Sequence, residues 1–374
     1  MNLKLTRFII PVLLLMFTQT SFAQSGKENP ITTAVPFLRL ASDARTGGMG
    51  DVGVATDPDA YAMFYNGGKT VFNDGKYGIG LTYTPWLSEF DIKNLFQASV
   101  AGFYKLDEKQ AISFGFRNFS QGTFTFTDAI GNEVSTFKPS DIAIEAGYSR
   151  KLSGKSGLGL NIRYIRSRLA DNSVNSTYKT GSAVAADLSY FYTKKEWNFG
   201  VALTNLGSKL NYGGESAYIP ANLALGAAYN KKINSDNKIS FAFDLNKLLV
   251  PTPPDANNAQ GVADYNSKGV VGSWFSSFGD APGGGSEEVK EIQLGLGAEY
   301  MYKEMFSLRA GYFTENKLKG NRNYLTVGAG LHYKIAGLNF SYLLPTGNNT
   351  NDNALKNTFR LSLLFDFNSK TASK

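Results

Sequence analysis

The sequence predicts an all-β fold, a transmembrane antiparallel β-barrel of fourteen strands with an N-terminal plug or periplasmic segment. Three observations support this prediction: an export signal, short stretches in which apolar residues alternate with small or polar ones, and an even number of such stretches. Barrels of the bacterial outer membrane have this alternation because each strand faces lipid on one side and the lumen on the other.

The first residues indicate export. Basic residues precede an apolar run over residues 8–17, and Ser21-Phe22-Ala23 then supplies the small-x-small pattern of a signal peptidase site. We therefore assign residues 1–23 to a signal peptide and expect the mature chain to begin at Gln24. The alternative is an N-terminal membrane anchor, but a ten-residue run is too short to cross a bilayer of about 30 Å as a helix.

Composition excludes several classes of function. The formal net charge is +7 without a basic cluster interleaved with aromatic residues, so nucleic acid is not expected as a partner. The chain has no cysteine and therefore neither disulfides nor thiolate metal ligands, and we expect no cofactor. Mean hydropathy is −0.21 with 39 Gly, 27 Phe and 20 Tyr, and no mature stretch of 18 apolar residues exists. A membrane helix is therefore not expected, whereas barrel strands have this low average.

A period of two marks the expected strands. Ile112, Phe114 and Phe116 are apolar, whereas the residues between and after them are small or polar, and residues 158–164 and 325–333 repeat the pattern. Small residues on the second face suit a crowded barrel interior, whereas a soluble sandwich, the alternative, exposes longer polar side chains there. The stretches with this period lie near residues 77–86, 96–105, 111–119, 141–150, 157–167, 183–192, 197–203, 221–229, 238–246, 289–300, 306–313, 324–333, 338–344 and 358–367.

The connections between these stretches alternate in length, as they do between periplasmic turns and extracellular loops. Links after even-numbered stretches are brief, such as Asp107-Glu108-Lys109, and links after odd-numbered stretches are longer, up to residues 247–288. The order predicts an outer-membrane protein with periplasmic N- and C-termini. The expected domains are the signal peptide, a plug or periplasmic segment over residues 24–76, a barrel over 77–367 and a periplasmic tail over 368–374.

The segment before the first strand contains more glycine than a simple lead-in needs. A Gly-rich run can bind phosphate, but no Lys-Ser/Thr pair follows Gly50, so a folded plug or a periplasmic arm is favoured. Asp57-Pro58-Asp59 offers an N-cap, a proline at the first helical position and an acidic first turn, which predicts a short helix through about Tyr65.

This segment contains a run of closely spaced motifs: Asp43, Arg45, Gly47, Gly48, Met49, Gly50 and Asp51, followed by Asp57-Pro58-Asp59-Ala60 and Tyr65-Asn66. These motifs resemble the N-terminal signature of the PorV (LptO) family of Bacteroidetes outer-membrane proteins, relatives of the FadL fatty-acid channels. Asn66-Gly67-Gly68 departs from the Asn-Pro-Ala expected there. The resemblance extends to the aromatic-ended last stretch, and the fourteen strands agree with it.

This resemblance implies a role in type IX protein secretion rather than an enzymatic one. Its implied partners are a large outer-membrane translocon barrel, the C-terminal domains of secreted cargo, a sortase-like surface attachment complex and outer-membrane lipid. The second hypothesis is a FadL-like channel for hydrophobic small molecules, with a kink or bulge at Gly115 and Asn118 of the third stretch. Charged side chains that are expected to face the lumen argue against a continuous apolar path. The alternative is that these charges are present only because they pair with one another. The inward polar residues are Arg117, Asn161, Arg163, Asp187, Asp244, Glu299 and Arg360.

An enzyme is the third class, because the family's older name LptO refers to a proposed lipid A deacylase role. His332 is the only histidine, and alternation places it on the lumen side, away from a lipid substrate. We interpret it as a structural residue. Glu287 and Glu288 are expected to be solvated charges at a loop end, without metal-ligand spacing. The sequence therefore names no catalytic or metal-binding residue.

The longest link, residues 247–288, carries the bulky apolar residues Trp274, Phe275 and Phe278. In an extracellular loop these side chains would be exposed to water unless something covers them. Exposed aromatic clusters usually mark a partner site. The alternative is that these side chains fold back and cap the lumen of their own barrel. We expect them to bind the translocon or emerging cargo.

Overall fold

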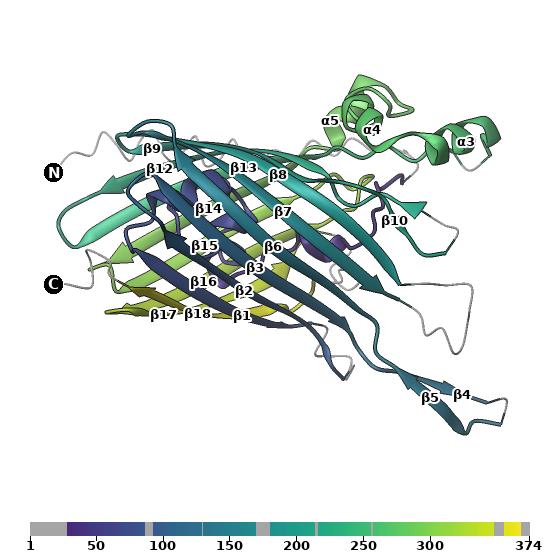
Figure 1. Ribbon diagram of the computed structural model, residues 1–374, viewed down its shortest axis with the longest axis horizontal. Helices are drawn as coiled ribbons and strands as arrows, with labels where there is room; N and C mark the ends of the chain where they lie inside the picture. Colours follow the sequence, from purple (N-terminus) through teal and green to yellow (C-terminus); the bar gives the residue numbers. More distant parts are fainter. Residues whose placement is uncertain are drawn as a thin grey trace.

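The computed structural model describes residues 28–86, 93–128, 130–169, 180–213, 216–255, 257–347 and 355–367. The predicted signal peptide and the predicted C-terminal tail lie outside the described residues. In the described part of the chain, fourteen strands form one closed antiparallel barrel (Figure 1), which confirms the predicted fold class.

Each predicted stretch corresponds to one barrel strand. The alternation places Ile112, Phe114 and Phe116 on the outer surface, where they are exposed, while Arg117 on the other face is buried. The barrel strands are β1 (Tyr77–Pro85), β2 (Leu95–Lys105), β3 (Gln110–Gln121), β6 (Ser140–Lys151), β7 (Ser156–Arg168), β8 (Gly181–Lys194), β9 (Trp197–Gly207), β12 (Asn222–Lys232), β13 (Asn237–Leu248), β14 (Gln293–Tyr302), β15 (Phe306–Thr314), β16 (Asn323–Tyr333), β17 (Ala336–Pro345) and β18 (Phe359–Phe367).

The seam of the barrel joins β1 to β18 in antiparallel register from Tyr77 opposite Phe367 to Tyr83 opposite Leu361. Pairing is continuous along β3, which disagrees with the kink or bulge expected at Gly115 and Asn118. The register shifts instead between β8 and β9. Gly115 is small for another reason: a Cβ there would lie 2.6 Å from Phe64 Cε1, inside the lumen.

The two ends of the barrel differ as predicted. At one end, which we call the short-turn end, brief turns such as residues 106–109 and 195–196 join successive strands. The other, long-loop end carries two hairpins, β4 (Phe124–Thr127) with β5 (Glu133–Phe137) and β10 (Leu210–Asn211) with β11 (Ser216–Ala217). It also carries the helices α3 (Ala259–Ser267), α4 (Val270–Ser276) and α5 (Gly285–Lys290) (Figure 1).

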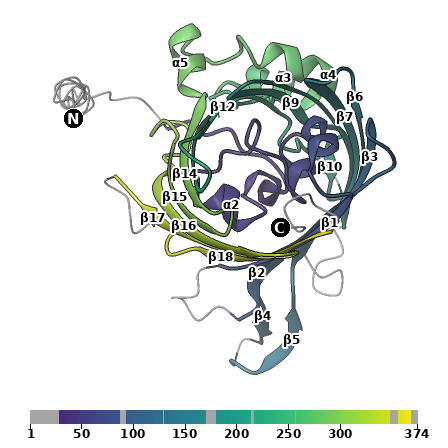
Figure 2. The same ribbon diagram turned by 90° about the vertical axis from the view of Figure 1, so that its left-hand side faces the viewer.

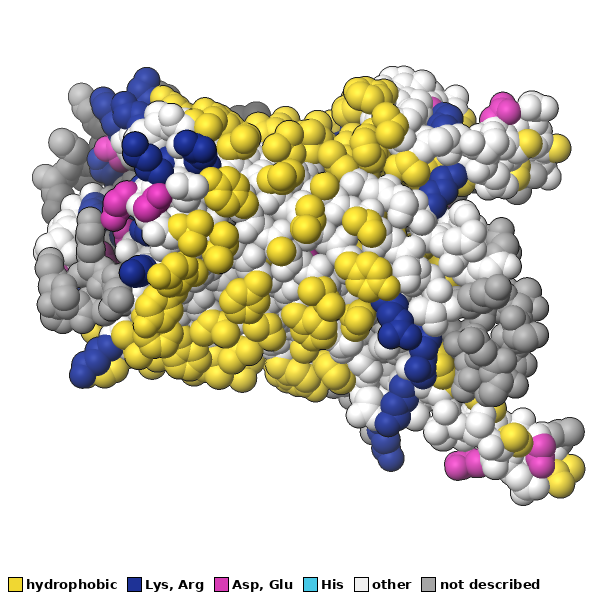
Figure 3. Space-filling view, viewed as in Figure 1, with side chains coloured by type: hydrophobic (Ala, Val, Ile, Leu, Met, Phe, Trp, Pro, Cys, Tyr) yellow, Lys and Arg dark blue, Asp and Glu magenta, His cyan; other side chains and the backbone are white. Residues whose placement is uncertain are grey.

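A band of hydrophobic side chains runs along the barrel wall, and Lys and Arg side chains lie beyond it toward both the short-turn and the long-loop end (Figure 3). None of the helices in the described ranges is long and apolar enough to cross a membrane. The hydrophobic band on the wall is the apolar belt expected of a strand-built membrane protein.

The N-terminal segment lies inside the barrel as a plug (Figure 2). Its short elements are η1 (Pro36–Arg39), α2 (Ala44–Gly47), η2 (Ala62–Phe64) and η3 (Gly67–Phe72). The segment begins at the long-loop end, where the Asn29 amide donates to Leu318 O, and it reaches Tyr77 at the short-turn end. We expected both chain ends on one side, but within the described residues the segment traverses the lumen, so its first residues and the end of β18 lie at opposite ends.

Candidate functional site

The glycine-rich signature lies directly on the barrel wall. A Cβ added to Gly311 would lie 2.0 Å from Gly50 N, and one added to Gly297 would lie 2.5 Å from Met49 O. Gly50 itself has a φ of +69°, a left-handed conformation that favours glycine. A Cβ added to the wall residue Gly328 would likewise lie 3.3 Å from Gly48 Cα. Glycine on both surfaces thus lets the backbone of the plug touch the backbone of β14, β15 and β16.

A second close approach involves the sequence that departs from the family pattern. Asn66 caps η3, because its side-chain oxygen accepts a hydrogen bond from Gly68 N at 3.0 Å. A Cβ on Gly159 of β7 would lie 2.4 Å from both Gly67 C and Gly68 N. The two glycines after Asn66 therefore lie flat against the wall.

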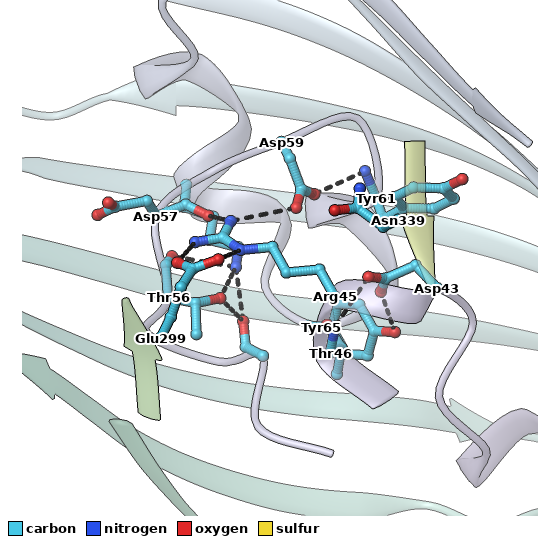
Figure 4. Close-up of polar contacts among 12 residues, drawn as sticks. Asp43, Arg45, Thr46, Thr56, Asp57, Asp59, Tyr61, Tyr65, Glu299 and Asn339 are labelled. Carbon is cyan, nitrogen blue, oxygen red and sulfur yellow. Dashed lines mark hydrogen bonds and ion pairs between the residues drawn. The ribbon is translucent and has the colours of Figure 1, made fainter. Parts of the chain in front are cut away.

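Arg45 is the centre of an ion-pair cluster that joins the plug to the wall (Figure 4). Its Nη2 lies 3.0 Å from Glu299 Oε2 on β14, and its Nη1 lies 3.3 Å from Asp59 Oδ2. Glu299 also accepts a hydrogen bond from Arg309 Nε at 2.7 Å, and its side chain is only 1% exposed. The cluster is therefore a buried arginine-carboxylate-arginine bridge between two parts of the chain far apart in sequence.

The two signature aspartates have separate roles. Asp43 caps α2 by accepting from Thr46 N at 2.9 Å, and its other oxygen accepts from the Tyr65 hydroxyl at 2.7 Å. Asp51 accepts from the Tyr324 hydroxyl of β16 at 2.6 Å. One carboxylate thus orders the plug internally, and the other holds it to the wall.

The helix predicted to begin at Asp57 does not form there. The residues that follow make only the short 3₁₀ helix η2. Instead, Asp57 accepts hydrogen bonds from the amide of Asn198 and from Lys238 of β13. These contacts with the wall replace the N-cap role that the local sequence suggested.

Several of the inward charges pair with one another, as one of the two explanations for them required, whereas Asp244 binds backbone amides of the plug. Arg117, Glu145, Arg163 and Asp187 form a ladder across β3, β6, β7 and β8, with N–O distances of 2.7, 2.8 and 2.7 Å. Arg117 also donates to the plug carbonyl of Leu38 at 3.1 Å. The seven inward polar residues predicted from the sequence are all buried.

Within the described residues, the lumen retains a cavity of about 100 Å³ between plug and wall. Its lining includes the charged side chains Arg39, Asp51, Asp244 and Arg322. Asp244 accepts hydrogen bonds from the plug amides of Gly53 and Val54. The cavity is thus small and has charged groups among its apolar lining, unlike a continuous apolar path through the barrel.

The longest loop folds into a helical subdomain, formed by α3, α4 and α5, that is attached by ion pairs. Lys247 Nζ lies 3.0 Å from Glu288 Oε2 and 2.7 Å from Glu291 Oε2. Lys319 Nζ lies 2.5 Å from Glu287 Oε1. Desolvation acts to raise the pKa of Glu287, but the hydrogen bond from Lys319 holds this pKa below its ordinary value. Our interpretation of both glutamates as solvated charges was therefore wrong.

The start of β14 also differs from the prediction. Residues 289 and 290 belong to α5, and the strand begins only at Gln293. The apolar Val289 and Ile292 made the strand pattern look longer than it is. The lysine contacts to Glu287 and Glu288 hold this stretch as a helix over the end of β13.

The three aromatic residues of the loop do not share one environment. Phe275 is 76% exposed and Phe278 is 53% exposed, while Trp274 is half-buried. Phe278 lines a groove of about 290 Å³ with Leu223, Leu225 and Val289 on the outer side of the wall. Two of the three side chains therefore offer apolar surface outside the barrel.

His332 is the second-last residue of β16 and is half-buried, and its backbone N–H donates to Met305 O at 2.7 Å. No group of three or more His, Cys, Asp or Glu side chains that could hold a metal occurs among the described residues. The polar networks here hold the plug and the loop, and sequence reasoning missed the plug contacts because they join residues up to 318 positions apart.

Comparison with known proteins identifies two kinds of similarity. A family model described as "Type IX secretion system protein PorV" matches residues 23–255. Among solved structures, the toluene transporter TbuX of Ralstonia pickettii aligns with a TM-score of 0.55 and 11% identity, covering 88% of this chain and 99% of that one. The CymD monoaromatic hydrocarbon channel aligns with a TM-score of 0.56 and 12% identity over 88% and 98% of the two chains. These identities indicate a shared fold only, and no curated protein sequence matches.

Proposed function

The chain belongs to the family of the type IX secretion system protein PorV, and from this premise we propose that it acts in protein secretion as a docking barrel. Its partners in this proposal are a large translocon barrel and the C-terminal domains of secreted cargo, which it delivers to a sortase-like surface attachment complex. Outer-membrane lipid surrounds it. The protein contributes binding surfaces to this process rather than an enzymatic reaction.

The filled lumen supports docking rather than conduction. Arg45 of the plug pairs with Glu299 of the wall, which also pairs with Arg309, and the lining of a luminal cavity of about 100 Å³ includes charged side chains. A hydrophobic solute moving through this lumen would have to separate buried ion pairs, and breaking such a pair costs roughly 3–5 kcal/mol. Cargo can instead bind at the long-loop end without moving the plug.

The observation that carries the proposal is the exposed aromatic surface of the helical subdomain. Phe275 and Phe278 are exposed, although ion pairs from Lys247 and Lys319 hold the subdomain in place. A surface that is apolar and already ordered loses little conformational entropy on binding, which favours affinity. We assign Trp274, Phe275 and Phe278 to a docking site for the translocon or emerging cargo.

Orientation follows from the same assignment. The long loops face the cell exterior and the short turns face the periplasm, as in other single-chain outer-membrane barrels. The C-terminal end of β18 then lies on the periplasmic side, whereas Asn29 lies near the cell surface. The signature residues Asp43 to Asp51 act in this proposal as the plug that closes the barrel to solutes.

The test replaces Trp274, Phe275 and Phe278 by Ser in the full chain. We expect heat-modifiable barrel folding to remain normal, while co-purification of the translocon and cargo is lost and secretion stops. The matched control replaces Phe124, Ile130 and Val134 by Ser, three exposed apolar residues of the β4–β5 hairpin at the same end. If the loop variant secretes and co-purifies at wild-type levels, the docking site is not on the helical subdomain.

A channel for hydrophobic small molecules is the second candidate, favoured by the fold shared with hydrocarbon channels. Uptake of toluene into proteoliposomes that contain the purified protein distinguishes the two functions. The docking proposal predicts a rate no higher than that of empty liposomes. Uptake that rises with the amount of protein would favour the channel.

A further inference from the structure

The outer wall is indented over β12 to β16. Along most of the belt large side chains face outward, but Ala298 of β14 and Ala310 of β15 are neighbours in register and both face outward. Together with Ala227 they form the floor of a groove of about 520 Å³, which we call the lateral groove. Its volume lies within the roughly 300–1,000 Å³ typical of ligand pockets.

The floor of the lateral groove is fixed from behind. Gly297 and Gly311 face the lumen beside the two alanines, and the plug residues Met49 and Gly50 touch them there. The wall cannot move inward because a single methyl group on Gly311 would already lie 2.0 Å from Gly50 N. The indentation is therefore a permanent feature of the surface and not a gap that the wall can close.

The lining of the lateral groove favours an apolar, hydrocarbon ligand. The sides of the groove are formed by aromatic and aliphatic groups, including Trp197, Phe241 and Tyr312, and no charged side chain lines it. The groove opens onto the outer surface, which meets lipid elsewhere around the barrel. If the groove stayed empty, its lining would lose van der Waals contacts that a flexible acyl chain can supply. A membrane acyl chain is the occupant that this surface meets.

The rim adds a charge argument. Trp197 and Tyr229 lie near the short-turn end, and such rings prefer the membrane interface. Exposed lysines follow or precede them within a few residues: Lys194 and Lys195 before Trp197, and Lys231 and Lys232 after Tyr229. Ammonium groups at this level complement the phosphate of a lipid whose chain enters the groove.

We propose that the lateral groove is a binding site for one acyl chain of an anionic phospholipid, with the phosphate held at the lysines of the short-turn rim. The site requires only the membrane-spanning barrel and its plug, so it goes beyond the docking function and does not depend on it. It lies on the lipid-facing side of the same wall segment that the plug signature contacts from within. Lipid and plug therefore stabilise β14 and β15 from opposite faces.

Trp197 provides an internal probe, since the chain has only three tryptophans. In the Trp86→Phe, Trp274→Phe background, we would titrate phosphatidylglycerol with brominated acyl chains into the protein in detergent and record Trp197 fluorescence. We expect saturable quenching, and at least a tenfold higher half-saturation concentration after Ala310→Phe fills the groove. Ala146→Phe, the same change on the outer face of β6, should leave the titration unchanged.

The headgroup arm compares brominated phosphatidylcholine, which lacks net charge. We expect phosphatidylcholine to bind more weakly than phosphatidylglycerol to the wild-type protein. Equal binding of the two lipids to the double variant Lys231→Gln, Lys232→Gln would support the phosphate contact. Native mass spectrometry of the wild-type protein gives a second readout that needs no tryptophan substitution, and one retained phospholipid is expected. Quenching that rises linearly without saturation, or equally in Ala310→Phe, overturns the proposal, as does retention of no lipid. Loss of a co-purifying barrel in Ala310→Phe with unchanged quenching would make the groove a protein contact instead.

Discussion

Replacing Glu299 by Gln should loosen the plug without unfolding the barrel. The Glu299 carboxylate is 1% exposed and pairs with Arg45 of the plug and Arg309 of the wall at 3.0 and 2.7 Å. The amide keeps the shape of the side chain but removes the charge, which leaves two buried guanidinium groups without it. Breaking a buried ion pair in this way costs roughly 3–5 kcal/mol.

This free energy appears as a change in the local opening of the plug. Since about 1.4 kcal/mol corresponds to a factor of ten, the loss should speed amide hydrogen exchange in residues 43–53 by roughly 100-fold or more. The assay is hydrogen exchange followed by mass spectrometry of the purified protein. Heat-modifiable migration on gels reports whether the barrel itself stays folded.

Asp187→Asn is the matched control. It also breaks a buried pair with arginine, 2.7 Å from Arg163, but both partners belong to the wall and neither contacts the plug directly. Exchange in the plug should stay near the wild-type rate in this variant. Equal acceleration in both variants, or none in Glu299→Gln, would refute the idea that Arg45 and Glu299 hold the plug.

Three other predictions concern the wall, the orientation and the single histidine. Gly311→Ala should destabilise the plug by at least about 1 kcal/mol, because its Cβ would lie 2.0 Å from Gly50 N. Gly154→Ala, which has open space around it, should be neutral in the same exchange assay. Single cysteines at Asp107, Lys195 or Lys303 should be shielded from an impermeant thiol reagent in whole cells, while cysteines at Gly213, Asn257 and Asn29 should react; the opposite sidedness would reverse our orientation. His332→Gln should leave secretion intact, and complete loss of secretion at a normal surface level would revive the deacylase hypothesis.

The strands could be predicted because their information is local. Ile112, Phe114 and Phe116 alternate with residues that face the lumen, and a lipid-facing surface imposes this period on every strand. The inward position of Arg117 and Asp187 follows from the same period. The resemblance in the plug segment likewise rested on residues close together in the chain.

The failures share a different cause, which is contact between residues distant in sequence. The sequence around Asp57 predicts a helix N-cap, but the Asp57 side chain contacts Lys238 instead. Gly115 was expected to mark a kink or bulge, but it makes room for Phe64. Glu288 looked solvated because its partner, Lys247, is 41 positions away. Local propensity is a weak prior that tertiary contacts can override. The docking role of Trp274, Phe275 and Phe278 stays a prediction.

The tight fit between plug and wall has a consequence for the order of folding. The seam pairs Tyr77 with Phe367, so the barrel can close only after the last strand has been made. Contacts of this sequence separation are slow to form because a long chain must be brought together first. Gly311 leaves no space beside Gly50 through which a segment could be threaded into a finished cylinder. We therefore infer that the wall assembles around residues 28–76, which contribute no strand to it but must already lie inside when the last strand closes the seam.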